Sequence, residues 1–522
     1  VEASASSGGQ ILPPVMGAAA FLIVQYTGTP FADVIVVAAI PAIVFFFGVW
    51  VMVHFEASKL GIGGLDPADL VDIRSHLKSG WFYLVPIGLL LYYLIVERLS
   101  VARSAWFTLV AIGALIALVA AYSDETRGRL GALFTGLFAA TLGAQYVAGA
   151  GILGALLGTG TGGQSLAAAF AATIGQLGGI SIVAGVLTLV THPFIEAPLL
   201  EFDDAVDRAA RTNADVLGRP RLADNGLHRL VVFLGKSMEG GARTAVPVVI
   251  AVAAAGIIPG VISVTGLGPN LVALIKAVAG GSLVLLLLVT AVSSILLGMG
   301  MPTTVTYIIL VSLLAPALTE FGVPLLAAHL FILYFGVIAD ITPPVAVAAY
   351  AASGVAKSDA FQTGIEAFSL SLNKAIVPFA FIVTPGIILL RRVPEDPGYR
   401  VVQTADLLDI GYSIPEILIP VAGVFLGVVA LAATVIGFAY APVSRGERAA
   451  FAFSSLLLMA PGLAVSGTYD LLGLVGIGGG EMTVLLDVAL RGVGLALFFF
   501  LMVKNRQRGG DPAAQSGTAE PA

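Results

Sequence analysis

Residues 327–349 read AAHLFILYFGVIADITPPVAVAA, an apolar run that ends at Asp340 and is followed by two consecutive prolines. An apolar helix of roughly 20 residues crosses a bilayer core of about 30 Å. Proline at membrane depth interrupts such a helix, and the backbone carbonyls that it frees need another partner. The stretch therefore predicts a helix that enters a membrane and is broken inside it.

The composition of the whole chain is that of a membrane protein. Of its 522 residues 58% are hydrophobic and only 11% are charged, with a net charge of −6, whereas soluble domains carry about 25% charged residues. The charged residues stand in short connections between long uncharged blocks, so we expect an all-α integral membrane protein with many spans. The alternation of an outer-membrane barrel strand, over about ten residues, is missing.

Several classes of chemistry are excluded by the residues themselves. The chain has no cysteine, which excludes disulfides and thiolate metal sites. It contains no pair of histidines at metal-ligand spacing, no phosphate-binding loop and no hydrolase motif. Its charged connections contain no basic block of the kind that binds nucleic acid. We therefore expect a protein that is not an enzyme and has no cofactor.

Three apolar blocks are shorter than a full span and are bounded by Pro, Gly and Thr instead of by charged loops. They lie at 11–27, 303–318 and 342–356, and a longer block follows at 373–391. Short segments of this kind are typical of the half-helices and re-entrant hairpins of transporters. The alternative is a set of ordinary helices that are kinked by proline.

The chain contains an internal repeat. Residues 11–19 read ILPPVMGAA and match ITPPVAVAA at 341–349 without a gap. Two proline-broken segments in corresponding positions of two halves point to the binding site of a transporter with inverted repeats. The second copy is preceded by GMGMPTT at 298–304. The chain begins at Val1, shortly before the first copy, so we expect the counterpart of GMGMPTT to lie outside this chain.

The breaks supply the candidate site residues. Freed carbonyls and threonine hydroxyls are oxygen ligands of the kind that hard cations prefer, although a packing kink with each Thr bonded to its own helix is the alternative. The small polar residues before the first Pro-Pro pair are predicted to line a substrate cavity. The candidate cation-binding residues are Gly298, Gly300, Met301, Pro302, Thr303, Thr304, Asp340, Ile341, Thr342 and Pro343, and the candidate cavity residues are Ser6, Ser7, Gly8, Gly9, Gln10, Pro13 and Pro14.

Asp340 is the sharpest single candidate. An ionisable side chain within a span costs several kcal/mol to bury and is a functional hypothesis by default. Its carboxylate is expected to act as a cation ligand or a proton carrier. The alternative is that the break lies at a water-filled mouth and Asp340 only caps a helix.

Four stretches together resemble the large membrane subunit of tripartite ATP-independent periplasmic (TRAP) transporters, most closely the fused permease that works with TAXI-type binding proteins. The resemblance covers residues 1–122 and 236–391. The stretches are VEASASSGGQILPPVMGAAAF (1–21), GARTAVPVVIAVAAAGIIPGVISVTGLG (241–268), GMGMPTTVTYIIL (298–310) and AAHLFILYFGVIADITPPVAVAAYAASGVAKSD (327–359).

The resemblance implies an elevator-type fold with two inverted repeats, each with a re-entrant hairpin and a broken helix. It also implies secondary active uptake of a small organic acid, such as a carboxylate, by sodium symport in the prokaryotic cytoplasmic (inner) membrane. The coupling ion is then the only bound metal. The implied partners are an extracytoplasmic substrate-binding protein and a small membrane subunit, fused upstream or separate.

Two other classes of membrane protein compete with a transporter. One is an intramembrane enzyme, which needs a nucleophile with a base or metal ligands in its spans. The other is a channel, which needs rings of like residues.

The domain organisation follows from the repeat and the charged connections. We expect the remainder of the first repeat and the following spans in 1–122, inserted spans and a polar connection in 123–235, the second repeat in 236–391, C-terminal spans in 392–503, and a disordered polar tail in 504–522.

Overall fold

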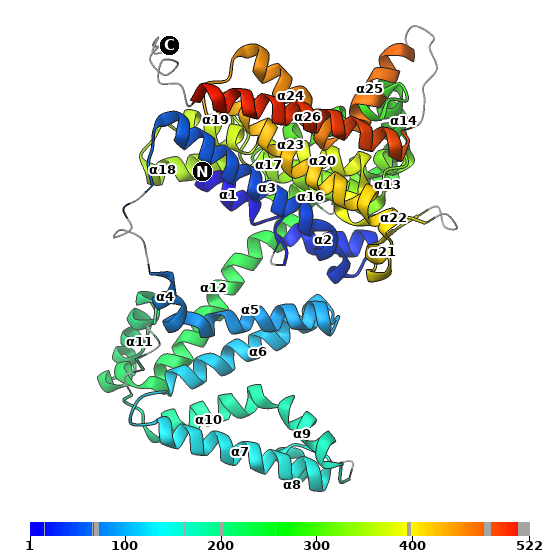
Figure 1. Cartoon of the computed structure of the whole chain (residues 1–522). Helices are drawn as coiled ribbons and strands as arrows, with labels where there is room; N and C mark the ends of the chain where they lie inside the picture. The colour runs from blue at the N-terminus through cyan, green and yellow to red at the C-terminus, as the bar shows by residue number, and fades with distance from the viewer. Residues whose placement is uncertain are drawn as a thin grey trace. The chain divides into compact units, whose positions relative to one another are not determined.

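The chain folds almost entirely into helices (Figure 1). The computed structural model describes residues 1–14, 16–64, 66, 72–160, 162–195, 197–198, 200, 202–255, 257–393, 398–473 and 482–509. Two compact units divide it, one formed by Val1–Val71 with Ile250–Ala522 and the other by Asp72–Val249. The boundary helix is α12 (Gly226–Ala255).

The first unit holds both copies of the repeat. Two short strands, β1 (Leu390–Arg392) and β2 (Tyr399–Val401), form an antiparallel pair in it. Its other helices are α1 (Glu2–Gly8), α2 (Ala18–Thr27), α3 (Phe31–Leu60), α13 (Ile257–Thr265), α14 (Leu267–Ala279), α15 (Leu283–Gly298), α16 (Thr303–Glu320), α17 (Leu325–Ala339), α18 (Val347–Ala356), α19 (Ala360–Leu370), α20 (Leu372–Val383), α21 (Thr404–Leu408), α22 (Ile410–Ser413), α23 (Ile419–Ile436), α24 (Arg445–Met459), α25 (Pro461–Gly473) and α26 (Val484–Gly509).

The second unit is a smaller helical body. Gly185 allows α10 to cross α6 closely, because a Cβ there would lie 2.5 Å from the carbonyl oxygen of Ala117. The charged connection before α12 forms the amphipathic helix α11, which buries Val206 and Ala210 against Val232. Its helices are α4 (Ile73–Gly80), α5 (Leu84–Leu91), α6 (Val101–Ala120), α7 (Arg127–Ala148), α8 (Ile152–Leu156), α9 (Leu166–Ile174), α10 (Leu177–Thr191) and α11 (Asp204–Val216).

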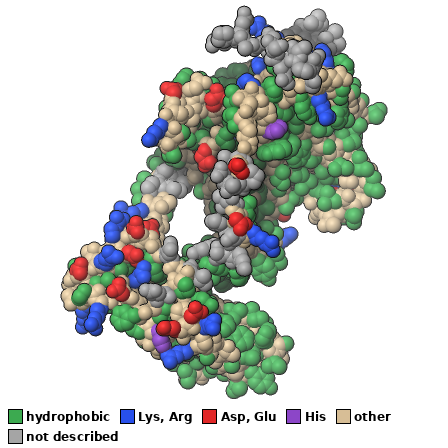
Figure 2. Space-filling view, turned by 60° about the vertical axis from the view of Figure 1, so that its left-hand side comes forward, with side chains coloured by type: hydrophobic (Ala, Val, Ile, Leu, Met, Phe, Trp, Pro, Cys, Tyr) green, Lys and Arg blue, Asp and Glu red, His purple; other side chains and the backbone are tan. Residues whose placement is uncertain are grey.

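The helices have the length and composition of membrane spans. Within the described residues seven helices are long and apolar enough to cross a bilayer, and two sharply bent helix pairs bring the number to nine. Hydrophobic side chains cover broad areas of the surface, whereas Lys, Arg, Asp and Glu gather in patches (Figure 2). Together these features confirm the predicted class, an all-α integral membrane protein.

Helix α17 is the core of the first unit. Every residue from Leu326 to Ala339 is buried, and the helix packs on α15, α16 and α20. A helix that is apolar on all sides is stable only where other helices surround it. The run that precedes Asp340 in the sequence is therefore a central element, and its C-terminal end lies at the break.

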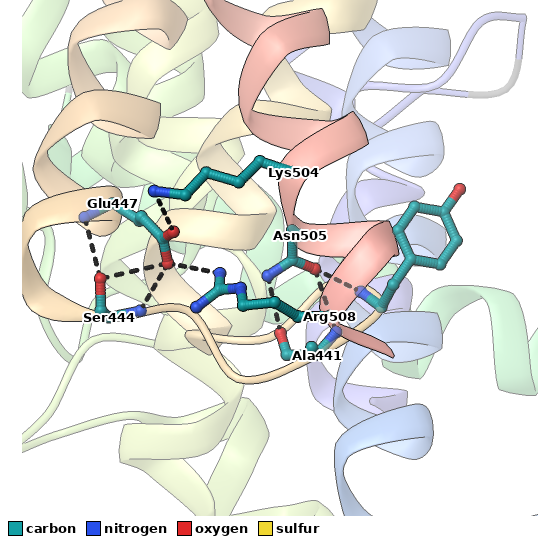
Figure 3. Close-up of polar contacts among 7 residues, drawn as sticks. Ala441, Ser444, Glu447, Lys504, Asn505 and Arg508 are labelled. Atoms are coloured by element: carbon teal, nitrogen blue, oxygen red, sulfur yellow. Dashed lines mark hydrogen bonds and ion pairs between the residues drawn. The ribbon is translucent and has the colours of Figure 1, made fainter. Parts of the chain in front are cut away.

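The last helix is fastened to the turn after α23 (Figure 3). The Asn505 side chain accepts hydrogen bonds from the backbone N–H groups of Tyr440 (2.9 Å) and Ala441 (3.0 Å). Glu447 pairs with Arg508 (2.6 Å) and Lys504 (3.3 Å). These contacts explain why α26 continues to Gly509, past residue 503, where the sequence predicts that a polar tail begins. Residues 510–522 lie outside the described part of the chain.

Candidate functional site

The GMGMPTT segment is a sharp turn between two helices. Helix α15 ends at Gly298, Gly300 has a φ of +79°, and Pro302 is the N-cap of α16. Glycine adopts such a left-handed conformation without the steric cost of a Cβ. A Cβ on Gly298 would lie 2.8 Å from side-chain carbons of Ala339 and Thr306. Glycine is therefore required both for the turn and for the close approach of α15 to α17.

Asp340 joins this turn to the second Pro-Pro break. Its carboxylate accepts a hydrogen bond from the Thr303 hydroxyl, with 2.8 Å between Oγ1 and Oδ2. The residue stands at the C-terminal end of α17, and the N-cap of the following helix α18 is Ala346. The carboxylate therefore caps neither helix, because C-terminal carbonyls need a donor. It lies half-buried between two segments that are distant in the sequence.

Thr342 is used differently from Thr303. Its hydroxyl donates to the carbonyl of Ile338 at 2.8 Å, within the end of α17. This is the local back-bonding that the sequence left open as the alternative for threonines at the break. Of these two threonines, only Thr303 reaches across to another segment.

The first break repeats the backbone of the second. In both, a residue two positions after the Pro-Pro pair has positive φ, +40° at Met16 and +28° at Ala346, and both Pro-Pro peptide bonds are cis. The same backbone hydrogen bonds recur. They run from Ile11 N to Gly8 O (3.0 Å) and from Met16 N to Leu12 O (3.1 Å) in the first break, and from Ile341 N to Ile338 O (3.1 Å) and from Ala346 N to Thr342 O (3.0 Å) in the second.

The two breaks meet in the first unit. Helix α1, before the first break, packs against α18, after the second, while α2 packs against α17. The Ser4 hydroxyl donates to the carbonyl of Ala367 at 2.8 Å, which fixes α1 on α19. The side chain of Gln10 lies near the Asp340 carboxylate. Thr303, Asp340 and Gln10, three residues predicted from the sequence, thus form one polar cluster.

A family model described as "Tripartite ATP-independent periplasmic transporter, DctM component" matches residues 1–198 and 227–395. The chain belongs to this family. DctM is the membrane transport component of TRAP transporters, a family of the prokaryotic inner membrane and not a class of enzymes. It works with a substrate-binding protein and a small membrane subunit. No curated protein and no solved structure matches the chain.

The extent of the DctM match bears on the predicted domains. It runs through residues 123–198, which the sequence suggested were inserted, and leaves only 199–226 of that segment unmatched. The compact unit that contains this segment is also larger than 123–235, because it spans Asp72–Val249. The segment is therefore part of the DctM component as far as residue 198.

The predicted cavity residues differ in exposure. Ser7 and Gly8 are buried, and a Cβ on Gly8 would lie 2.3 Å from the Phe45 ring. Gln10, Pro13 and Pro14 are half-buried, and Ser6 and Gly9 are exposed. The tight contact of Gly8 with Phe45 shows that α1 is packed directly on α3, so the end of this helix belongs to the interior of the unit. Val15, within the first Pro-Pro motif, lies outside the described residues.

Lys374 is a functional candidate that the sequence did not suggest. It is 0% exposed, and its ammonium donates to the Ser7 hydroxyl at 2.7 Å. The sequence places it at the polar edge of an apolar block that starts at 373, where a lysine is ordinary. Instead Ala360–Val383 forms one candidate span, and Lys374 lies well inside it. The signal that could have found it is the acidic N-cap Asp359, which opens the helix early.

Proposed function

We propose that this DctM component carries a small organic acid into the cell together with sodium, and that Asp340 is the principal cation ligand. The observation that carries the proposal is the environment of the Asp340 carboxylate. It accepts a hydrogen bond from the neutral Thr303 hydroxyl and lies near the neutral Gln10 amide, and within the described residues no Lys or Arg nitrogen forms an ion pair with it. A carboxylate within a membrane core that has no ion-pair partner attracts a cation.

The surrounding oxygens support sodium as that cation. The turn at 298–304 and the break at 340–343 interrupt helices beside the carboxylate, and backbone carbonyls at such breaks are oxygen ligands of the kind that hard cations take. Within the described residues, the buried hydroxyls of Ser294 and Thr306 have no hydrogen-bond partner, and both lie within two turns of GMGMPTT. The proposed cation site comprises Gly298, Gly300, Met301, Pro302, Thr303, Thr304, Asp340, Ile341, Thr342 and Pro343.

We assign the substrate to the other side of the same region, near Ser6–Gln10 and the first Pro-Pro pair. The recurrence of the break's backbone hydrogen bonds supports an inverted repeat, and so does the crossed packing of α1 on α18 and of α2 on α17. An inverted pair of broken helices brings cation and substrate together near the bilayer midplane. An elevator-type movement and a TAXI-type binding protein complete the proposal.

Uptake into proteoliposomes tests the sodium coupling. The full transporter, reconstituted with its small subunit, would receive carboxylates on its binding protein, with an inward sodium gradient or an equal potassium gradient at the same membrane potential. We expect uptake with sodium only, and only in the presence of the binding protein. Equal uptake in potassium would refute the coupling, and flux without binding protein would favour a channel.

A further inference from the structure

Lys374 lies beside the first break in a site without a carboxylate neighbour. Its ammonium donates to Ser7 Oγ at 2.7 Å and stands 4.4 Å from the centre of the Phe45 ring. Within the described residues no Asp or Glu oxygen lies within 4.0 Å of it. A hydroxyl and the face of an aromatic ring are weak partners for a buried cation.

Phe45 receives two polar neighbours from the same turn of α20. The residue before Lys374, Asn373, is also 0% exposed, and its amide nitrogen donates to the Phe45 carbonyl at 2.6 Å. This bond holds α20 against α3, and the Lys374 ammonium then lies against the Phe45 ring and the Ser7 hydroxyl. The position of the ammonium beside the first break is therefore fixed by packing on both sides.

The two copies of the repeat differ in the charge of one side chain at the break. Alignment of ILPP with ITPP puts Gln10 opposite Asp340, so the first break has a neutral amide where the second has a carboxylate. The first break instead has the lysine beside Ser7. The second break, with Asp340, therefore has no cation of its own. The first break has the ammonium of Lys374, which is part of the protein.

We propose that the Lys374 ammonium is a tethered cation, which takes at the first break the role that a free sodium ion takes at the second. The idea rests on the proposed sodium coupling and deepens it. Asp340 forms no ion pair with Lys374, so the second break still binds a free sodium ion, whereas the first break needs none. The transporter then moves one sodium ion fewer per substrate than it would if both breaks bound free ions.

A matched pair of variants separates a tethered cation from a lysine that merely fills space. Lys374→Ala removes the charge and opens room for a sodium ion with water beside Ser7. Lys374→Met removes the charge but keeps most of the volume. For the alanine variant we expect sodium uptake curves with a higher half-saturation and a Hill coefficient raised by about one, since it binds one more free ion.

Thermal melting of the purified protein gives a second readout that does not require transport. A ligand that binds only the folded state raises the melting temperature with its concentration. With potassium as the control salt, a rise in sodium concentration should raise the melting temperature of Lys374→Ala more than that of the unchanged protein. The melting temperature of Lys374→Met should rise no more than that of the unchanged protein. Lys374→Ser, which adds a hydroxyl ligand, replaces the alanine variant if that one does not fold.

The outcomes distinguish the two levels of the proposal. If the unchanged transporter shows no sodium dependence, the sodium coupling fails. If the unchanged transporter depends on sodium but the alanine, serine and methionine variants share one Hill coefficient and one sodium response in melting, the tethered cation is refuted and Lys374 is a packing residue. A gain confined to the alanine or serine variant supports it.

Discussion

The two Pro-Pro breaks of this DctM component have the same backbone and different charges. Both carry the same hydrogen bonds and a positive φ two residues after the prolines. The second break holds Asp340 with a threonine, whereas the first holds Gln10 and lies beside Lys374. The comparison teaches that proline and glycine set the geometry of such a site, while single side chains decide which break can recruit a free ion.

Asp340→Asn should give the largest effect, because it removes the only negative charge of the two breaks. A contact at about 4 Å in an effective dielectric near 20 is worth roughly 4 kcal/mol before desolvation. We expect a net loss of about 1–3 kcal/mol, seen as a ten- to hundredfold rise in the sodium half-saturation of uptake. Asn keeps the shape and one acceptor, so the melting temperature without sodium should hold.

One outcome would contradict the assignment of Asp340. If both the sodium half-saturation and the maximal uptake are unchanged in Asp340→Asn, the carboxylate is not a cation ligand. Thr303→Val is the matched control, because it removes the 2.8 Å hydrogen bond and keeps the charge. Its effect on sodium should be smaller than that of Asp340→Asn.

Gln10→Ala should give an intermediate effect and tests whether the two breaks act together. The amide lies near the Asp340 carboxylate across the interface of the two copies. A hydrogen bond from this amide to the carboxylate contributes about 1 kcal/mol, or about a fivefold change in sodium half-saturation. The direction of this change depends on how sodium binds. If sodium replaces the amide as the partner of Asp340, loss of the amide lowers the half-saturation. If sodium binds while the amide stays in place, loss of the amide raises it.

Sodium titration of Gln10→Ala and of Gln10→Met, which fills the same space, measures that direction. A change shared by both variants belongs to the lost amide, and a change in the alanine variant alone belongs to packing. Identical curves for both variants and the unchanged protein would mean that the first break does not act on Asp340.

The sequence predicted the helical membrane fold and the repeat because both depend on local signals. Long uncharged blocks have only one stable conformation in lipid, and Pro-Pro pairs mark the breaks wherever they occur. Thr303 and Asp340 could be named as candidates from the sequence for the same reason, since both residues stand at breaks.

The role of Lys374 was out of reach because it depends on two distant contacts. Its partners Ser7 and Phe45 precede it by more than 300 residues, and periodicity carries no information on which helices adjoin. The same reason hid the end of α26, where Asn505 binds the turn after α23 and Arg508 pairs with Glu447 of α24. A polar composition indicates a tail only where nothing packs against it.

Asp406→Asn should have the smallest effect on transport, because its carboxylate, unlike that of Asp340, is already paired. Asp406 lies outside the spans, in α21 beside the β1–β2 hairpin. It receives hydrogen bonds from Arg400 (2.5 and 2.7 Å), from the Gln403 backbone N–H (2.8 Å) and from Arg391 (2.6 Å). We expect an unchanged sodium half-saturation and a lower melting temperature at neutral pH.

The pH dependence of that melting temperature separates pairing from cation binding. The Arg400 guanidinium, followed by the Gln403 N–H and then Arg391, holds the pKa of Asp406 well below its usual range. A carboxyl whose pKa is lower in the folded state contributes stability above its unfolded pKa of about 4 and loses it as the pH falls further. The difference between Asp406→Asn and the unchanged protein should therefore be full at pH 7 and shrink below about pH 4. A difference that stays constant with pH would assign the effect to packing, and a shifted sodium curve would extend the cation site to this hairpin.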